Sequence, residues 1–196
     1  MTLNNPELDK NNPKQLIEKT KTLFKWRIIE VIEKDIDWRK FEIARRSPWV
    51  RLIIRDWNKI LLTKEYRHEH DGYDYRLPGG KVFDTLEEFN EKIKANENIN
   101  IYAEKAARNE CKQETWLIPK EIEHIAISKA GATIERDLHY FLVNDFENNE
   151  LWQELEDGEK ITTEWKSLEE AKQLCLDWSI KEDRSVWILL RHILTQ

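Results

Sequence analysis

The sequence predicts an α/β sandwich, in which helices cover a mixed β-sheet. Segments with strand-like alternation are interleaved with helix-like segments in the order helix, strands, hairpin, glycine loop, helix, strands, helix, helix. The chain has 196 residues, of which 40% are hydrophobic and nine are Trp. This is enough apolar surface to build the core of one domain.

The composition restricts the classes of function. Lys and Arg total 32 against 38 for Asp and Glu, so the net charge is −6 and the chain lacks the basic footprint of a nucleic-acid binder. Cys111 and Cys175 are too few for a disulfide framework. No apolar run is long enough for a signal peptide or a membrane span, so we expect a cytoplasmic protein that makes no contact with a membrane.

The N-terminal segment is expected to carry a helix and two strands. Asn12-Pro13 is a typical helix start, because Asn caps a helix and Pro fits its first turn, and this helix would reach about Thr22. Loose alternation of apolar residues predicts strands over 24–33 and 41–45.

A β-hairpin and a glycine turn follow this segment. Alternating residues over 49–55 and 60–67 flank Asp56-Trp57-Asn58-Lys59, which predicts a hairpin. A polar loop from His68 to Asp74 leads into Leu77-Pro78-Gly79-Gly80-Lys81-Val82, whose glycines allow close approach of the backbone to a phosphate. The two His of this loop lack the further ligands that zinc needs, so a polar loop over a site is the favoured interpretation.

The remaining elements are helices and strands with recognisable ends. Asp84 or Thr85 caps a helix that ends near Ala95, and a second helix runs from about Tyr102 to Thr115. Strands are predicted over 122–127, 138–143 and 161–165, and capping boxes at Ser167–Glu170 and Ser179–Glu182 predict two terminal helices.

Glu110 and Glu114 are the strongest candidates for catalytic residues. They are four residues apart in the predicted helix, so they lie one above the other and can share one cation. A carboxylate pair beside a glycine turn suits a magnesium-assisted attack on a diphosphate. Taken alone, Glu-x-x-x-Glu on a helix is more often a solvated face, and the Leu-Pro-Gly-Gly turn upstream shifts the balance towards a metal site.

Together these residues resemble the Nudix hydrolase signature, which reads glycine, five residues, glutamate, seven residues, then Arg-Glu-apolar-any-Glu-Glu-any-Gly-apolar. Gly80 matches the first glycine, and the second half is matched by Glu110, Cys111, Glu114 and Leu117. The resemblance implies a Nudix-type α/β/α sandwich with a mixed sheet, here with an N-terminal helix and strand extension. We place this extension at residues 1–45 and the Nudix domain at 46–196.

The signature is altered at several positions. Asn109 replaces its arginine, Gln113 its first paired glutamate and Trp116 its glycine, so we expect the helix to end differently, with Pro119 as the stop. Gly80 and Asn109 are separated by 28 residues, about fifteen more than in the signature. Ile101 then stands at the early glutamate, and the insertion falls at about 84–100.

Two flanking patterns narrow the resemblance to ADP-ribose and nucleoside-diphosphate-sugar pyrophosphatases. Lys64-Glu-Tyr-Arg-His68 resembles their Gln-Tyr-Arg-His pattern. Glu159-Lys-Ile-Thr-Thr-Glu164-Trp165, followed by Leu-Glu-Glu-Ala171, resembles the end of these enzymes. The resemblance therefore covers roughly Phe24 to the C-terminus.

The resemblance also implies roles for individual residues. Mg²⁺ (or Mn²⁺) would be held by Glu110, Glu114, a backbone carbonyl at Gly79 and the amide oxygen of Gln113. A late glutamate would act as the general base, and the candidates are Glu154, Glu156, Glu159 and Glu164. Arg67 would clamp a phosphate, with Gly80 and Lys81 as further substrate contacts; a plain surface arginine is the alternative for Arg67.

The expected function is therefore the Mg-dependent hydrolysis of a nucleoside diphosphate linked to another group. The alternative is a Nudix-like domain that has lost turnover and serves as a nucleotide-binding or interaction module. The apolar N-terminal strands indicate a homodimer, because so small a sheet must bury its face against something. Packing on its own chain is the other solution for these strands.

Overall fold

The computed structural model describes residues 19–36, 38–149 and 161–195, which form two compact units. Of the described residues, the first unit contains those up to Arg46, together with Ala130–Glu135. The second unit contains Ser47–Lys129 and the described residues from Arg136 onward. The domain boundaries expected from the sequence put residues 130–135 in the Nudix domain. In the structure this segment belongs to the first unit, and no local sequence pattern indicates that.

The first unit is a four-stranded sheet in the order β1-β2-β3-β9. Its strands are β1 (Lys19–Lys25), β2 (Glu30–Ile36), β3 (Arg39–Arg45) and β9 (Ile134–Glu135). The sequence places a helix end at residues 19–22, and this is wrong because Thr at every second position favours a strand. The start of that helix at 12–13 lies outside the described residues. The strand predicted over 24–33 is broken by a turn, in which the Trp26 N–H donates to the Ile29 carbonyl (2.7 Å).

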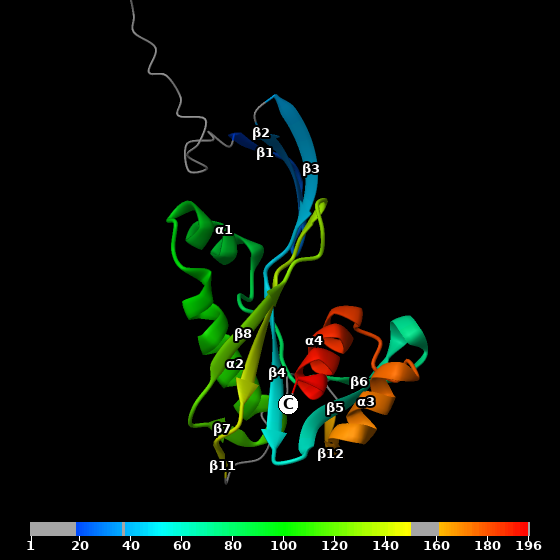
Figure 1. The fold of residues 1–196 in the computed structure, drawn as a ribbon. Coiled ribbons are helices and arrows are strands. Elements are labelled where there is room, and N and C mark those ends of the chain that lie inside the picture. Colours follow the sequence, from blue (N-terminus) through cyan, green and yellow to red (C-terminus); the bar gives the residue numbers. More distant parts are fainter. Residues whose placement is uncertain (1–18, 37, 150–160, 196) are drawn as a thin grey trace, which may run out of the picture. The chain divides into compact units, whose positions relative to one another are not determined.

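A mixed sheet forms the centre of the second unit (Figure 1). Its order is β12 (Ile161–Ser167), β5 (Lys59–Arg67), β4 (Trp49–Asp56), β10 (Leu138–Val143) and β8 (Glu123–Ser128), with β6 (Gly72–Arg76) paired to β5. The β10–β4 pair is parallel and the other pairs are antiparallel. A separate ribbon joins β7 (Leu117–Pro119) to β11 (Phe146–Asn148).

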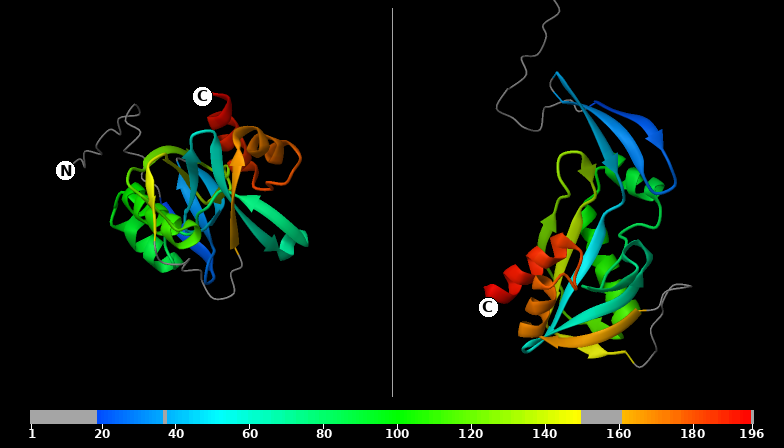
Figure 2. Two further views of the ribbon diagram at one scale, coloured as in Figure 1. Left: turned by 90° about the horizontal axis from the view of Figure 1, so that it is seen from below. Right: turned by 90° about the vertical axis from the view of Figure 1, so that its right-hand side faces the viewer.

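Helices cover both faces of this sheet, which makes the second unit an α/β/α sandwich (Figures 1 and 2). Helix α2 (Ile99–Thr115) packs on one face through Ala103, Ala107 and Cys111, against Val50, Leu52 and Phe141. Helices α3 (Leu168–Leu176) and α4 (Asp183–Leu194) cover the other face, where Ala171 and Leu189 belong to the same core cluster as Ile53 and Ile60. The inserted segment forms α1 (Leu86–Lys94), which buries only Leu86.

The hairpin of β4 and β5, the caps at Thr85 and Ser167, and the position of α2 agree with the sequence predictions. The polar loop predicted over 68–74 is instead a short 3-10 helix, η1 (His68–His70), followed by β6. The capping box predicted at Ser179 is also absent: α4 begins after Glu182, whose carboxylate pairs with Arg51 instead of capping the helix.

The end of α2 differs from the sequence prediction as well. Trp116 has φ 61° and ψ 15°, so it takes the left-handed conformation that a family glycine would take. A tryptophan pays about 1–2 kcal/mol for this conformation. The chain then enters β7 directly, and the Asn149 N–H donates to the Trp116 carbonyl (2.7 Å). None of the helices in the described part of the chain is long and apolar enough to cross a membrane.

Candidate active site

One stripe of α2 faces the glycine turn across a cavity of about 520 Å³. The stripe follows helical spacing, since residues three and four apart on a helix share a face. The lining residues of α2 are Tyr102, Lys105, Ala106, Asn109, Glu110, Gln113 and Glu114. The other walls are Trp49, Glu65, Arg67, Gly79 to Asp84, Glu88 and Ile161.

The glycine turn is held as an extra strand beside β4. Strand β4 pairs with β5 only over Ile54–Asp56, and nearer its start it binds the turn instead. The Val50 N–H donates to the Gly80 carbonyl (2.9 Å) and the Leu52 N–H to the Pro78 carbonyl (2.8 Å). Gly79 has φ 140°, and a Cβ there would overlap the Val50 carbonyl, so no other residue fits this position.

Both candidate carboxylates lie against this turn. Glu114 Oε2 accepts a hydrogen bond from the Gly79 N–H (2.7 Å). A Cβ on Gly80 would overlap the Glu110 carboxylate, so Glu110 reaches the turn only because residue 80 has no side chain. The i, i+4 spacing on α2 therefore brings the two carboxylates together at the glycine turn, where both line the cavity.

The Gly79 carbonyl is engaged elsewhere. It accepts a hydrogen bond of 2.6 Å from Nη1 of Arg51, which is buried. A carbonyl oxygen that already holds a guanidinium is a weak ligand for a second cation, because the two positive charges repel each other. This contact argues against the Gly79 carbonyl as a metal ligand, and its assignment stays a prediction; Gln113 offers a neutral amide oxygen at the cavity wall.

The carboxylate oxygens of Glu110 and Glu114 are suitable ligands for a hard divalent cation. Mg²⁺ keeps several waters and needs only one or two carboxylates, so Glu110 and Glu114 satisfy its requirement. Within the described ranges, no group of three or more His, Cys, Asp or Glu side chains is placed to hold a metal. The two histidines of the predicted polar loop, His68 and His70, lie on η1.

Three cationic side chains line the same cavity: Arg67, Lys81 and Lys105. Arg67 pairs with Glu65 (2.8 Å), while its buried Nε has no hydrogen-bond partner among the described residues. Lys105 is not among the residues that the sequence predicts for this site. Helical periodicity could have identified it, because Lys105 precedes Asn109 by four residues and therefore lies on the same stripe of α2. The cavity thus contains, beside its carboxylates, three cations of a kind that bind phosphate groups.

Glu164 is the late glutamate that falls in the described part of the chain, and it does not line the cavity. Glu164 is paired in register with Leu62, which packs towards α3 and α4, so it lies on the face of the sheet opposite Glu110. It binds the Tyr75 hydroxyl (3.2 Å) and the Lys166 ammonium (2.5 Å). The hydrogen bond from Lys166 holds the pKa of Glu164 below its usual value. This placement argues against Glu164 as the general base.

The other three candidates for the base, Glu154, Glu156 and Glu159, lie outside the described residues.

A comparison with solved structures identifies the fold. The chain is similar to a crystal structure described as an ADP compounds hydrolase, with a TM-score of 0.62 and 17% sequence identity. The match covers 90% of this chain and 92% of that chain. No family model and no curated protein matches the sequence. At this identity the likeness concerns the fold, and it confirms the predicted α/β class with mixed sheets and helices.

Proposed function

We propose that this protein is a Mg-dependent hydrolase of the Nudix type that cleaves a nucleoside diphosphate linked to another group, such as ADP-ribose or a nucleotide sugar. One observation carries the proposal: Glu110 and Glu114 lie at the Gly79–Gly80 turn in a cavity that Arg67, Lys81 and Lys105 also line. The name of the structural neighbour, a hydrolase of ADP compounds, supports the same substrate class.

In this proposal the residues of the cavity have separate roles. Arg67, Lys81 and Lys105 bind the phosphate oxygens, Arg67 through its two-pronged guanidinium. Glu110 and Glu114 hold Mg²⁺ (or Mn²⁺), which when bound polarises a phosphate and acidifies a water. The Gly79 N–H keeps the Glu114 carboxylate oriented through their hydrogen bond of 2.7 Å. With Glu164 on the other face of the sheet, Glu159 remains a proposed base together with Glu154 and Glu156.

The alternative function is a nucleotide-binding or interaction module without turnover. Asn109 and Gln113 favour it, because both line the cavity as neutral residues where the family signature has charges. With two carboxylates in place of a larger acidic cluster, the site would hold fewer cations. Such a module would still bind the substrate's phosphates through the cationic walls.

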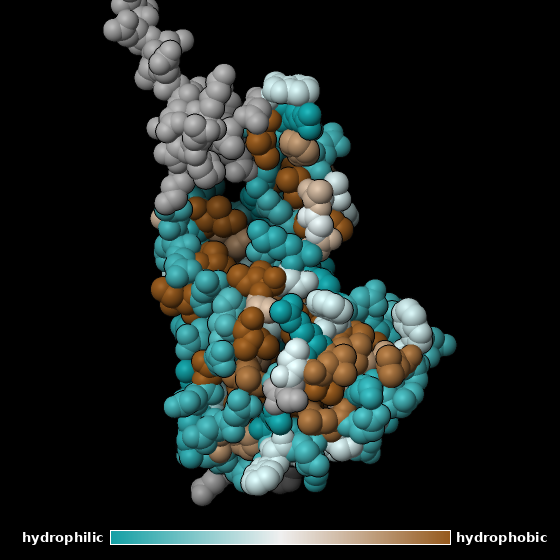
Figure 3. All heavy atoms as spheres, in the orientation of Figure 1, coloured by the Kyte–Doolittle hydropathy of each residue, from teal (hydrophilic) through white to brown (hydrophobic). Residues whose placement is uncertain are grey.

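The proposed assembly is a homodimer built on the first unit. Its strands and turns leave large apolar side chains exposed: Leu23, Phe24, Trp26, Ile28, Trp38 and Phe41. Figure 3 shows apolar residues on the visible surface of these strands. A two-fold axis would let the same patch on two chains cover itself.

A substrate panel separates the two functions. Purified protein is incubated with ADP-ribose, nucleotide sugars and nucleoside triphosphates, with Mg²⁺ or Mn²⁺, and phosphate-containing products are measured. We expect cleavage of a diphosphate-linked compound, its loss in Glu114→Gln, and its retention in Glu104→Gln, which changes the exposed face of α2. Binding of ADP-ribose without cleavage under all these conditions would establish the alternative.

A further inference from the structure

Arg51 is a buried cation that touches the active-site turn from behind. Its side chain is 2% exposed and alternates along β4 with Val50 and Leu52, which pack towards α2, so it lies on the face covered by α3 and α4. Its Nη1 donates to the Gly79 carbonyl (2.6 Å) and, at 3.5 Å, to the Val50 carbonyl. Arg51 therefore binds the turn from the α3 and α4 face of the sheet, opposite the face that carries the carboxylates.

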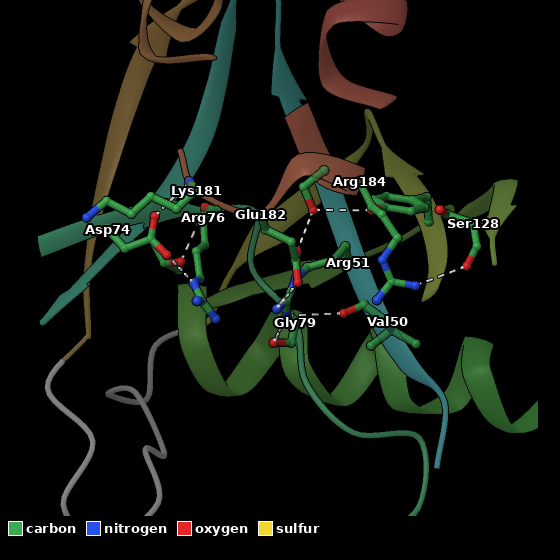
Figure 4. Close-up of polar contacts among 12 residues, drawn as sticks. Val50, Arg51, Asp74, Arg76, Gly79, Ser128, Lys181, Glu182 and Arg184 are labelled. Carbon is green, nitrogen blue, oxygen red and sulfur yellow. Dashed lines mark hydrogen bonds and ion pairs between the residues drawn. The ribbon is translucent and has the colours of Figure 1, made fainter. Parts of the chain in front are cut away.

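Glu182 holds this guanidinium in place (Figure 4). Its two carboxylate oxygens accept hydrogen bonds from Arg51 Nε (2.8 Å) and Nη2 (3.2 Å), a two-pronged geometry. The Ser185 hydroxyl donates a further bond of 2.6 Å to Glu182. The buried Asp74 carboxylate accepts the Lys181 N–H (3.1 Å) and so fixes the segment that carries Glu182.

The pair is fully charged and costs free energy to bury. Burial works to raise the pKa of Glu182, but the charge and hydrogen bonds of Arg51 outweigh it and lower that pKa to about 2. A buried ion pair of this kind often stabilises a fold no better than apolar residues of the same volume. Removing one partner would be costly, but a gain in stability over apolar residues gives little reason for an ion pair here. Its contact with Gly79 gives a better one.

We propose that Arg51 and Glu182 are positioning residues for the carboxylate site on the other face of the sheet. A continuous chain of hydrogen bonds links Glu182 to Glu114. It joins Glu182 to Arg51, Arg51 to the Gly79 carbonyl, and the Gly79 N–H to Glu114. The pair fixes the orientation of Gly79, and this orientation sets where Glu114 stands. Glu182 also cancels the charge of Arg51, which would otherwise repel a cation held by Glu114. This inference rests on the proposed function of the carboxylates.

Binding of Mn²⁺ tests the proposal without any substrate. The dissociation constant of the metal is measured by titration calorimetry for the full chain, for Glu182→Gln and for Asp74→Asn. Glu182→Gln keeps the shape but loses the charge, and we expect its dissociation constant to rise about tenfold, as for other residues that orient metal ligands. Asp74→Asn alters a buried carboxylate of β6 that does not touch the turn, and its Oδ1 can still accept the Lys181 N–H, so we expect little change.

A second readout follows the turn itself. The chain contains five glycines, so labelling with ¹⁵N-glycine yields a simple amide spectrum. We expect Glu182→Gln to move the Gly79 and Gly80 signals and to leave Gly131 unchanged, because Gly131 belongs to the other unit. If Glu182→Gln does not fold, Ser185→Ala removes one bond to the same carboxylate and should act in the same direction to a smaller degree.

The outcomes separate this proposal from the proposed function. A wild-type chain that binds no Mn²⁺ contradicts the metal site, and the glycine spectrum then still decides whether Glu182 positions the turn. Unchanged Gly79 and Gly80 signals would overturn the positioning role. Equal weakening of Mn²⁺ binding in Glu182→Gln and Asp74→Asn would overturn it too, because a general loosening of the segment would then explain the effect.

Discussion

Replacement of Gly80 by Ala tests whether the glycine turn exists to admit a carboxylate. A Cβ at residue 80 would overlap the Glu110 carboxylate, which is the far end of a flexible side chain. Gly80 does not have a positive φ, so Ala fits its backbone. The side chain of Glu110 should therefore move away while the backbone stays in place.

The expected magnitudes differ for stability and for metal binding. Gly to Ala at a permitted backbone position stabilises a protein by about 0.4–1 kcal/mol through the unfolded chain, and this offsets part of the cost of moving Glu110. We expect the free energy of unfolding to change by less than about 1 kcal/mol. Loss of one of two carboxylate ligands should weaken Mn²⁺ binding by at least about tenfold, which is 1.4 kcal/mol.

Gly79→Ala is the matched control and should behave in the opposite way. Gly79 has φ 140°, and its Cβ would overlap the Val50 carbonyl, which is backbone and cannot move aside. The strained conformation alone costs about 1–3 kcal/mol, and the overlap adds to it. For a chain of this size, a loss of about 3 kcal/mol lowers the melting temperature by roughly 6–12 °C.

Thermal unfolding and Mn²⁺ titration of both variants complete the experiment. We expect a stable Gly80→Ala protein that binds metal weakly, and a destabilised Gly79→Ala protein. A Gly80→Ala protein that binds Mn²⁺ as tightly as the wild type would refute the placement of Glu110 against the turn. A Gly79→Ala protein of unchanged stability would refute the packing of the turn on β4.

Three further predictions concern pH, substrate binding and assembly. Because the pKa of Glu182 is lowered from 4.5 to about 2 in the folded state, its contribution to stability is complete above about pH 5 and is lost as the pH falls towards 2. That contribution is about 3 kcal/mol, and urea unfolding at several pH values should show a flatter acid limb for Glu182→Gln. Lys105→Ala should raise KM about tenfold with little change in kcat, since one charged contact to a phosphate is worth about 1.5 kcal/mol or more, and equal KM values would exclude Lys105 from substrate binding. Light scattering at micromolar concentration should give about twice the chain mass of 23.7 kDa, and a mass near that of one chain would exclude the homodimer.

Elements that depend on neighbouring residues could be predicted from the sequence. The hairpin around Trp57 is encoded by alternation on both sides of a polar turn, and the start of α3 by the capping box at Ser167. The approach of Glu110 and Glu114 belongs to the same class, because four residues on a helix define one face whatever surrounds it. In each case the partners are close in the chain, so local geometry decides.

What the sequence could not decide depends on which distant segments meet. Glu164 matches a family pattern, but the register of β12 on β5 turns it to the face opposite the cavity. A shift by one residue would have reversed that face, and local sequence does not set the register of two strands so far apart in the chain.

The partner of Glu182 follows the same rule. Ser179 and Glu182 fit a capping box, yet Glu182 binds Arg51, which is 131 residues away in the chain. A buried guanidinium must be neutralised, and this requirement outweighs a helix cap worth about 1 kcal/mol. The sequence by itself thus determined α1, α2, the start of α3, the hairpin and the carboxylate pair. Only the tertiary structure decided which charges face the cavity and which hold its turn from behind, because burial and long-range pairing exist only in the folded chain.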